Sequence, residues 1–277
     1  MEHDPDGEDR ALEAEYNNRA KVPGHPAILA GWQADAAAFR AAWTEAETGI
    51  AYGSTERSKL DLFWPNERRD ARIAMFIHGG YWQGLDRASF SHLARGLLAH
   101  GVAVAMPSYD LCPHVTMTII VEQLRECAGF LARRHGAPVL AAGHSAGGHL
   151  AAMIMAADWK ERGLATHPAP HALALSGLFD LLPLLRTSIN RALQMDRATA
   201  LSLSPACLPR PGGHIHAMVG GLEGREYERQ AREIAAAWGG SSEVLAGHDH
   251  FTIVSELADP DSAVVLRAVD LMARTAG

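Results

Sequence analysis

The sequence predicts an α/β fold in which a mostly parallel central sheet is covered by helices on both faces. From residue 50 onward, short apolar runs alternate with segments of helical periodicity, a rhythm typical of strands joined by crossover helices. Hydrophobicity within the runs is continuous rather than alternating, as expected for strands buried on both faces. We expect strands at 60–64, 72–78, 102–109, 138–143, 171–177, 214–220 and 242–248.

Three apolar stripes at helical spacing separate these runs, and each ends at a glycine, which favours a helix C-cap. The stripes are Phe90, Leu93, Leu97 and Leu98 before Gly101; Ile120, Leu124, Cys127 and Leu131 before Gly136; and Tyr227, Ala231, Ile234, Ala235 and Trp238 before Gly239 and Gly240. Two further helical pieces are expected within 11–43, split by the Pro- and Gly-containing residues 22–26.

The 277 residues contain no recognisable linker or repeat, so we predict one domain over 1–277, with residues 1–10 disordered. Residues 181–205 exceed a simple crossover between two strands. This excursion forms either a partial lid of short helices or an ordinary pair of surface helices. The sequence favours neither interpretation over the other.

Composition narrows the class of partner. The formal net charge of −7 and the lack of a Lys/Arg block argue against nucleic acid as the main partner. Three scattered cysteines do not make a disulfide framework or a CxxC metal site, which favours a reduced, cytoplasmic setting. The acidic start lacks the features of a signal peptide, and no apolar run has the roughly 20 residues that a membrane helix needs. We therefore expect a soluble protein with small-molecule or protein partners.

The strongest local signal is "GHSAG", residues 143–147, which matches the G-x-S-x-G pattern of a nucleophile elbow. Glycines two before and two after Ser145 permit a sharp turn that leaves the hydroxyl at its crest. The pattern alone is weak. Its context is the required one, because an expected strand precedes it and an apolar helical segment follows it.

An oxyanion-binding loop is indicated upstream. "HGGYW", His78 to Trp82, follows the expected strand at 72–78, and its glycines would let backbone N–H groups approach a substrate. The hole would combine the N–H groups of Gly79 and Gly80 with that of Ala146. A glycine pair after a strand is by itself more often an ordinary turn, but the elbow downstream favours the functional interpretation.

The general base and the acid should follow the serine in the order Ser, Asp/Glu, His. "GHDHF" offers His248 and His250 as bases, and we favour His250 because it lies just before the expected final helix. Asp180 and Glu223 each follow an expected strand. Because the acid usually follows the penultimate strand, we favour Glu223, flanked by glycines, over Asp180, which would instead cap a helix or brace a loop.

The motifs "HGGYW" and "GHSAGGHL" resemble those of the hormone-sensitive-lipase-like branch of the α/β-hydrolases, and within it the kynurenine formamidase (arylformamidase) group. "EYNNRA", "SGLFDLLPL", "EYERQ" and "DHF" are similar to further landmarks of that group in the same order, from residue 16 to about residue 254. The resemblance matches the nucleophile to Ser145 and the base to His250. The family's aspartate falls on Glu223, a departure that lengthens the acid by one methylene.

The resemblance implies hydrolysis of an N-formyl group on an aryl amine through a formyl-Ser145 intermediate, with no metal and no cofactor. Many relatives also cleave small aryl esters, so a generic carboxylesterase is the alternative. Tyr81, Trp82, Phe179 and the 181–205 excursion could wall an aromatic pocket, or the aromatic residues could simply pack in the core.

Two other classes compete with a serine hydrolase. "HIH" (His214, His216) and "HDH" (His248, His250) each have a spacing that can bind zinc, as in a metallohydrolase. That interpretation leaves the elbow and "HGGYW" unexplained. A non-catalytic binding protein on the same fold would usually lose the nucleophile or the base, whereas both are present here.

Overall fold

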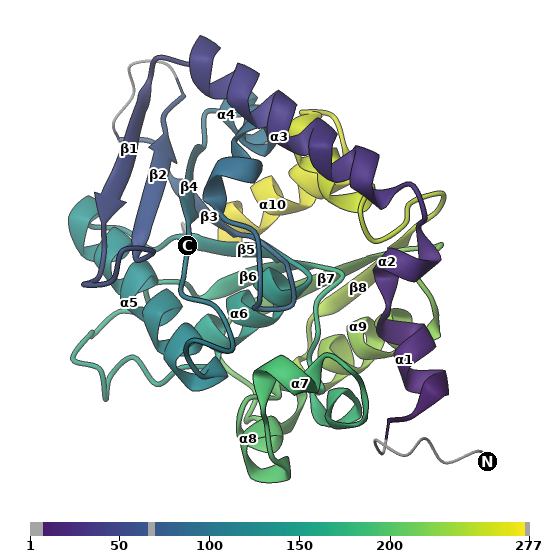
Figure 1. The fold of residues 1–277 in the computed structure, drawn as a ribbon. Coiled ribbons are helices and arrows are strands. Elements are labelled where there is room, and N and C mark those ends of the chain that lie inside the picture. The colour runs from purple at the N-terminus through teal and green to yellow at the C-terminus, as the bar shows by residue number, and fades with distance from the viewer. Residues whose placement is uncertain (1–7, 66–69, 275–277) are drawn as a thin grey trace.

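The computed structural model describes residues 8–65 and 70–274, and it contains one eight-stranded sheet in the order β1-β2-β4-β3-β5-β6-β7-β8 (Figure 1). From β3 to β8 all neighbouring strands are parallel, whereas β2 pairs antiparallel with both β1 and β4. The strands are β1 (Ala46–Ala51), β2 (Lys59–Phe63), β3 (Ile73–Ile77), β4 (Ala103–Pro107), β5 (Leu140–His144), β6 (His171–Leu175), β7 (His214–Gly220) and β8 (Ser241–Leu245). The predicted mostly parallel sheet is confirmed.

Each central strand feeds two hydrophobic cores, one on each face of the sheet. In β3, Ile73, Met75 and Ile77 belong to one core, and Ala74 and Phe76 belong to the other. Because successive side chains point to opposite faces, a strand covered on both sides must be apolar throughout. This is the physical reason for the continuous hydrophobic runs in the sequence.

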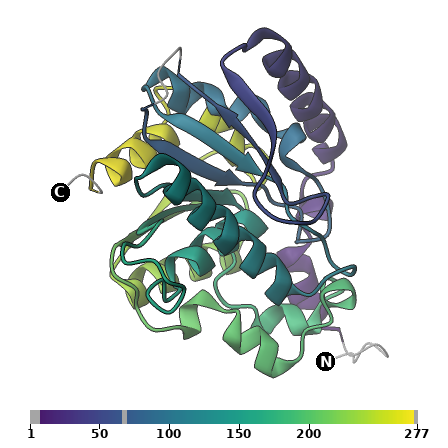
Figure 2. The same ribbon diagram turned by 90° about the vertical axis from the view of Figure 1, so that its left-hand side faces the viewer.

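Helices form a layer on each side of the sheet (Figures 1 and 2). The layer over one core contains α3 (His25–Ala42), α4 (Arg95–Ala99) and α10 (Ala263–Ala273), and the opposite layer contains α5 (Met117–His135), α6 (Ala146–Met155) and α9 (Arg225–Trp238). The glycine caps predicted for α5 and α9 are found, since Gly136 and Gly239 both have left-handed backbone conformations.

Two predicted elements differ from the structure. The stripe from Phe90 to Leu98 forms 3-10 turns followed by the five-residue α4 rather than one helix. The edge strand β1 was not expected, because its exposed residues carry no buried apolar run.

Two excursions lie near the carboxyl ends of the parallel strands, where ligand sites form in open α/β sheets. The first contains α1 (Arg10–Tyr16) and α2 (Asn18–Lys21), which lie beside α9 (Figure 1). The second contains a 3-10 turn (Leu182–Arg186), α7 (Asn190–Leu193) and α8 (Arg197–Ser202). The predicted disorder of residues 1–10 lies largely outside the described residues, and residues 8–10 are placed.

Candidate active site

Ser145 stands at a strained corner between β5 and α6. Its φ of 55° and ψ of −119° lie in a region that residues other than glycine rarely adopt. The backbone N–H of Ser145 donates to the carbonyl of Leu175 at 2.8 Å, which ties the corner to the neighbouring strand β6. Ser145 is only 2% exposed, yet it lines a cavity at the carboxyl ends of the strands.

The two glycines of the elbow are required by close backbone packing. A Cβ on Gly143 would lie 2.2 Å from the carbonyl oxygen of Gly147, and a Cβ on Gly147 would lie 1.9 Å from the carbonyl oxygen of Ile77. Both distances are impossible for a side chain without a shift of the backbone. The strand-to-helix turn can therefore form only with glycine at these positions.

Glu223 and His250 form a buried, charge-assisted pair. The Glu223 carboxylate oxygen Oε2 lies 2.7 Å from Nδ1 of His250, and the two residues are 2% and 5% exposed. The other oxygen, Oε1, accepts from the Ser176 hydroxyl at 2.5 Å and from the backbone N–H of Gly220 at 2.6 Å. With Nδ1–H donating to the carboxylate, Nε2 of His250 is left as the acceptor that a general base needs.

The competing acid and base make other contacts. Asp180 accepts from the backbone N–H of Leu182 at 3.1 Å and lies 3.6 Å from the Arg229 guanidinium. Nε2 of His248 lies 3.7 Å from the Glu256 carboxylate. The structure thus brings together the favoured pair of the sequence analysis and places both alternatives in different surroundings.

A second histidine supports the base. Nε2 of His144 donates to the backbone carbonyl of His250 at 2.8 Å, and the two rings lie 4.8 Å apart. Burial lowers the pKa of His144 well below its usual value, and the nearby His250 acts in the same direction. His144 is therefore a neutral donor that fixes the His250 backbone. The sequence analysis gave it no role, although it precedes Ser145 in the motif.

Of the three residues predicted for an oxyanion hole, Gly79 and Ala146 lie directly beside Ser145, and Gly80 lines the same cavity. A Cβ on Gly79 would lie 3.1 Å from Cβ of Ser145, so this glycine packs directly on the serine. Gly80 has a φ of 110°, and a Cβ there would lie 2.4 Å from the carbonyl oxygen of Gly84. Ala146 is the first residue of α6, where the helix itself offers its N–H no acceptor.

Between the described side chains of Ser145 and His250 no hydrogen bond is formed in this structure, although both line the same cavity. Catalytic hydrogen bonds in unliganded enzymes are often long and tighten only when substrate binds. The site therefore contains a serine, a histidine and a carboxylate, with the histidine bound to the carboxylate and, among these described side chains, no hydrogen bond to the serine.

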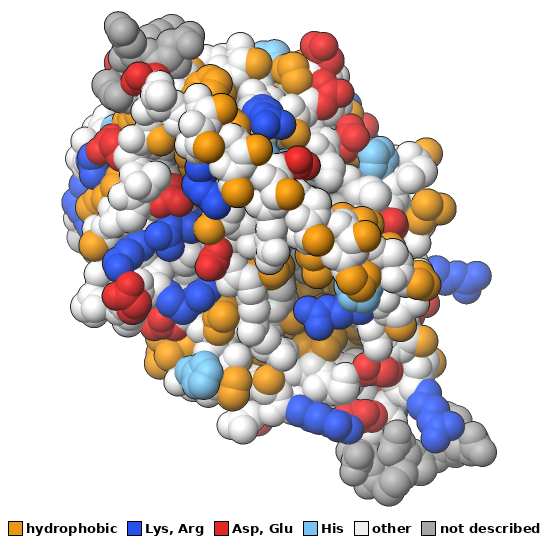
Figure 3. Space-filling model, turned by 45° about the horizontal axis from the view of Figure 1, so that its top comes forward, with side chains coloured by type: hydrophobic (Ala, Val, Ile, Leu, Met, Phe, Trp, Pro, Cys, Tyr) orange, Lys and Arg blue, Asp and Glu red, His pale blue; other side chains and the backbone are white. Residues whose placement is uncertain are grey.

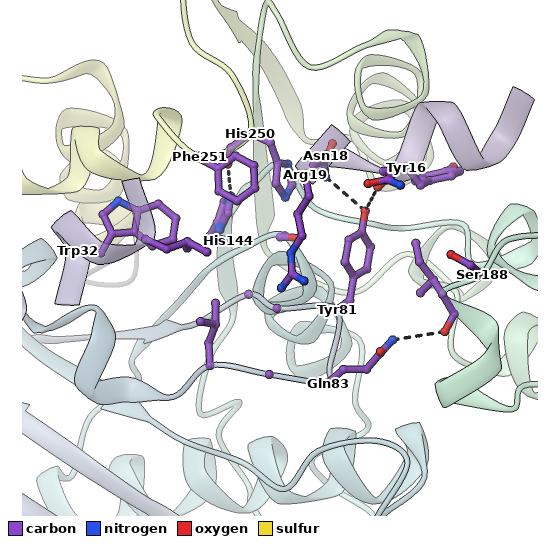
Figure 4. A pocket seen from close by; sticks show the side chains of 18 of the residues that line it. Tyr16, Asn18, Arg19, Trp32, Tyr81, Gln83, His144, Ser188, His250 and Phe251 are labelled. Atoms are coloured by element: carbon purple, nitrogen blue, oxygen red, sulfur yellow. Dashed lines mark hydrogen bonds between the residues drawn. The ribbon is translucent and has the colours of Figure 1, made fainter. Parts of the chain in front are cut away.

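The cavity has a volume of about 360 Å³, within the range of small-molecule sites. One part of its wall is largely apolar and aromatic, with Leu29, Trp32, Leu85 and Phe251. Another part is polar and includes Glu13, Asn17, Asn18, Arg19, Gln83 and Ser188 (Figure 4). On this side of the molecule, Figure 3 shows hydrophobic side chains inside a hollow and a basic side chain at its edge.

The predicted aromatic wall is only partly found. Tyr81 lines the cavity, with its hydroxyl 2.8 Å from that of Tyr227. Trp82 and Phe179 are 0% exposed and pack in the hydrophobic core outside the cavity lining, Trp82 edge-on against His149. These two aromatics are core residues because the chain turns them inward, and we do not carry them into the proposed site.

The excursion at 181–205 contributes Ser188 and Ile189 to the cavity wall, as a partial lid would. The larger contribution comes from the N-terminal helices, which the sequence analysis did not assign to a pocket. Asn18 donates to the hydroxyl of Tyr227 at 2.7 Å and to that of Tyr81 at 3.3 Å. The "EYNNRA" segment, which resembles a landmark of the formamidase group, was the available signal.

The histidine pairs of the metallohydrolase interpretation are separate. His214 and His216 lie at the start of β7, opposite the end that leads to Glu223, and both contact the Ser241 hydroxyl, at 2.9 and 2.5 Å. Within residues 8–65 and 70–274, no cluster of three or more His, Cys, Asp or Glu side chains is arranged to hold a metal ion.

No helix in the described ranges has the length and apolar character needed to cross a membrane.

Comparison with known proteins finds related hydrolases. The BD-FAE family model matches residues 60–167. The kynurenine formamidase of Salmo salar is 30% identical over 241 residues, 82% of each chain. A candidate thioesterase of known structure from Silicibacter sp. TM1040 is 35% identical, with a TM-score of 0.87 over 93% of this chain and 98% of its own. A hormone-sensitive lipase from a metagenome library shares the fold at 19% identity, with a TM-score of 0.70 over 89% of this chain and 90% of its own. The chain is an α/β-hydrolase enzyme and belongs to the kynurenine formamidase family.

Proposed function

We propose that this hydrolase is a serine enzyme that cleaves small aryl formamides of the N-formylkynurenine type through an acyl-Ser145 intermediate. One observation carries the mechanism: His250, held at 2.7 Å by the buried Glu223 carboxylate, lines the same cavity as the strained Ser145. Membership of the formamidase family supports the substrate class.

In the first half-reaction, Nε2 of His250 takes the proton of the Ser145 hydroxyl as its oxygen attacks the formyl carbon. The carbonyl oxygen becomes an oxyanion, which the N–H groups of Gly79, Gly80 and Ala146 stabilise. The C–N bond then breaks, and His250 gives its proton to the departing aryl amine. Glu223 stabilises the imidazolium and keeps its ring oriented throughout.

In the second half-reaction, a water molecule attacks the formyl-Ser145 ester while His250 accepts one of its protons. Collapse of the tetrahedral intermediate returns that proton to the Ser145 oxygen and releases formic acid, which ionises to formate in water. No group besides water is consumed, so the residues described here suffice for the whole cycle.

The longer acid at position 223 is compatible with this role. Its carboxylate is held from two directions, by Ser176 and by the Gly220 N–H, while the other oxygen reaches His250. The extra methylene relative to the family's aspartate is thus accommodated by the local loop, and glutamate acids occur in this fold.

The test compares turnover of N-formylkynurenine with that of p-nitrophenyl acetate and butyrate. An acyl thioester belongs in the same panel, because the Silicibacter relative is described as a candidate thioesterase. A formamide preference of several hundredfold supports the proposal, and Ser145→Ala should abolish that turnover. Ester cleavage without formamide cleavage would instead identify a carboxylesterase.

The covalent mechanism is tested separately with a fluorophosphonate. Labelling of Ser145 in the folded protein, absent in Ser145→Ala, supports the acyl-enzyme route. A folded protein that resists labelling and loses activity with a chelator would favour the metallohydrolase alternative.

A further inference from the structure

Arg19 brings a basic side chain to the catalytic cavity. It lies in the middle of the four-residue helix α2 and is one of the residues that line the cavity together with Ser145 and His250. In Figure 4 its side chain runs into the cavity, between Tyr81 and His144 in this view. The guanidinium therefore faces the space that a substrate would fill.

The guanidinium has no partner within the part of the chain that the structure describes. The nearby acids of α1 are already engaged: Glu13 accepts from the backbone N–H and the hydroxyl of Ser188, at 2.8 and 2.7 Å. Glu15 pairs with Lys21 at 3.4 Å. Among the described residues Arg19 is thus not held in an ion pair, although the Glu13 carboxylate lines the same cavity and keeps its own charge.

A guanidinium offers a planar fork of donors that matches a carboxylate in a two-pronged contact. The protein as a whole carries a formal charge of −7, so its overall field does not attract an anion. Any preference for an anionic substrate must come from a local group. The lining, as far as the structure describes it, has one guanidinium, that of Arg19, and one carboxylate, that of Glu13, so the preference depends on a direct contact with Arg19 rather than on an excess of positive charge in the cavity.

We propose that Arg19 is a specificity-determining residue that binds a carboxylate on the leaving-group side of the substrate. This inference deepens the proposed function and rests on it for the choice of side. A formyl group is a single carbon, so the amine portion must fill most of the 360 Å³ cavity. Its aryl ring would pack near Trp32 and Phe251, and its carboxylate would reach Arg19.

The experiment uses two aryl acetates that differ only in charge. One is 3-(3-acetoxyphenyl)propanoate, and the other is its neutral primary amide. The meta arrangement keeps the carboxylate from attacking its own ester. The measured quantity is the ratio of kcat/KM for the anionic ester to kcat/KM for the neutral one, which cancels general losses of activity.

In Arg19→Gln we expect this ratio to fall about 10- to 100-fold, the range of a charge-assisted contact. Arg19→Lys keeps the charge but not the fork, and should give an intermediate ratio. Arg197→Gln removes the same charge from an exposed position outside the cavity lining and should leave the ratio at the parent value. Because Arg19 is exposed, the parent ratio should also decline as salt is raised.

An unchanged ratio in a folded Arg19→Gln protein would overturn the inference, as would an equal change in Arg197→Gln. The proposed function fails separately. If the ratio falls in Arg19→Gln but the parent does not hydrolyse formamides, the carboxylate site is supported and the formamidase assignment is rejected. If the parent hydrolyses formamides but the ratio is unchanged in Arg19→Gln, the formamidase assignment is supported and the carboxylate site is rejected.

Discussion

The Glu223 carboxylate lies 2.7 Å from Nδ1 of His250, while Asp180 lies within reach of Arg229, 3.6 Å away. This relationship supports Glu223 as the acid of the proposed triad. Glu223→Gln should lower kcat by about 10⁴-fold, because an amide can stabilise the wrong imidazole tautomer and cannot stabilise the imidazolium. Asp180→Asn should stay within a few-fold of the parent. Steady-state kinetics on the best substrate of the panel provides the measurement.

The same two variants can also show that the assignment is wrong. Should Asp180→Asn lose several orders of magnitude while Glu223→Gln retains turnover, the assignment of the acid is wrong. Glu223→Asp adds a graded control, since the shorter side chain cannot hold Ser176, Gly220 and His250 simultaneously without movement of the loop.

Ser176 is a positioning residue for Glu223. It sits after β6 at a strained φ of 50° and donates to Oε1 of Glu223 at 2.5 Å. Ser176→Ala would leave that oxygen with the Gly220 N–H alone. We expect kcat to fall about tenfold with KM little changed, because one hydrogen bond to a charged group is lost.

A matched control for this variant is Ser204→Ala. Ser204 is also fully buried and makes two hydrogen bonds, to Leu181 and Ala200, at a place outside the cavity lining. Its loss should lower stability and leave kcat at the parent value. Equal kcat losses in both variants would show that the effect of Ser176→Ala comes from a general loss of stability and not from the position of Glu223.

The elbow was predictable because its geometry is local. The tight turn around Ser145 requires glycine at 143 and 147, so the local sequence itself indicates the turn. The order of the acid and the base follows from the strand order, which the apolar runs revealed.

Other features depend on tertiary contacts that no local pattern reports. Trp82 and Phe179 are aromatic like Tyr81, and only the course of the chain decides that the first two point into the core. Strand β1 is exposed at the sheet edge, so it lacks the apolar signature of the central strands. The N-terminal helices contact residues that lie about 200 positions later in the sequence. The local sequence of α1 and α2 does not indicate this contact.

Lys21 connects those N-terminal helices to the acid loop. Its ammonium donates to the backbone carbonyl of Glu223 at 2.8 Å and to that of Glu15 at 2.7 Å. In Lys21→Met both contacts are lost, and the segment that carries Arg19 should detach more often from the loop. We expect kcat/KM to fall up to about tenfold and proteolysis near residues 22–24 to accelerate.

Lys160→Met, an exposed lysine beyond the carboxyl end of α6, is the control for the removed charge. Its kinetics and its cleavage rate should match the parent. If Lys21→Met behaves in the same way, the N-terminal helices are held by their other contacts and Lys21 has no positioning role.

Buried histidines should make the fold sensitive to mild acid. Burial lowers the pKa of His149 and of His78 to about 4, well below the value of roughly 6.5 in an unfolded chain. Between these values the unfolded chain binds a proton that the native protein does not, so stability falls as the pH decreases. Each such histidine contributes about 1.4 kcal/mol per pH unit to the slope.

His149→Gln tests this effect away from the catalytic cavity. Nε2 of His149 donates to the Leu203 carbonyl at 2.8 Å, and a glutamine amide can replace that donor without titrating. Urea unfolding at pH 6.0, 5.5 and 5.0 should give a dependence of the free energy of unfolding on pH that is shallower by nearly 1.4 kcal/mol per unit than in the parent. Parallel lines for the two proteins would mean that His149 binds its proton equally well in both states, and the acid sensitivity would then have to arise from other groups.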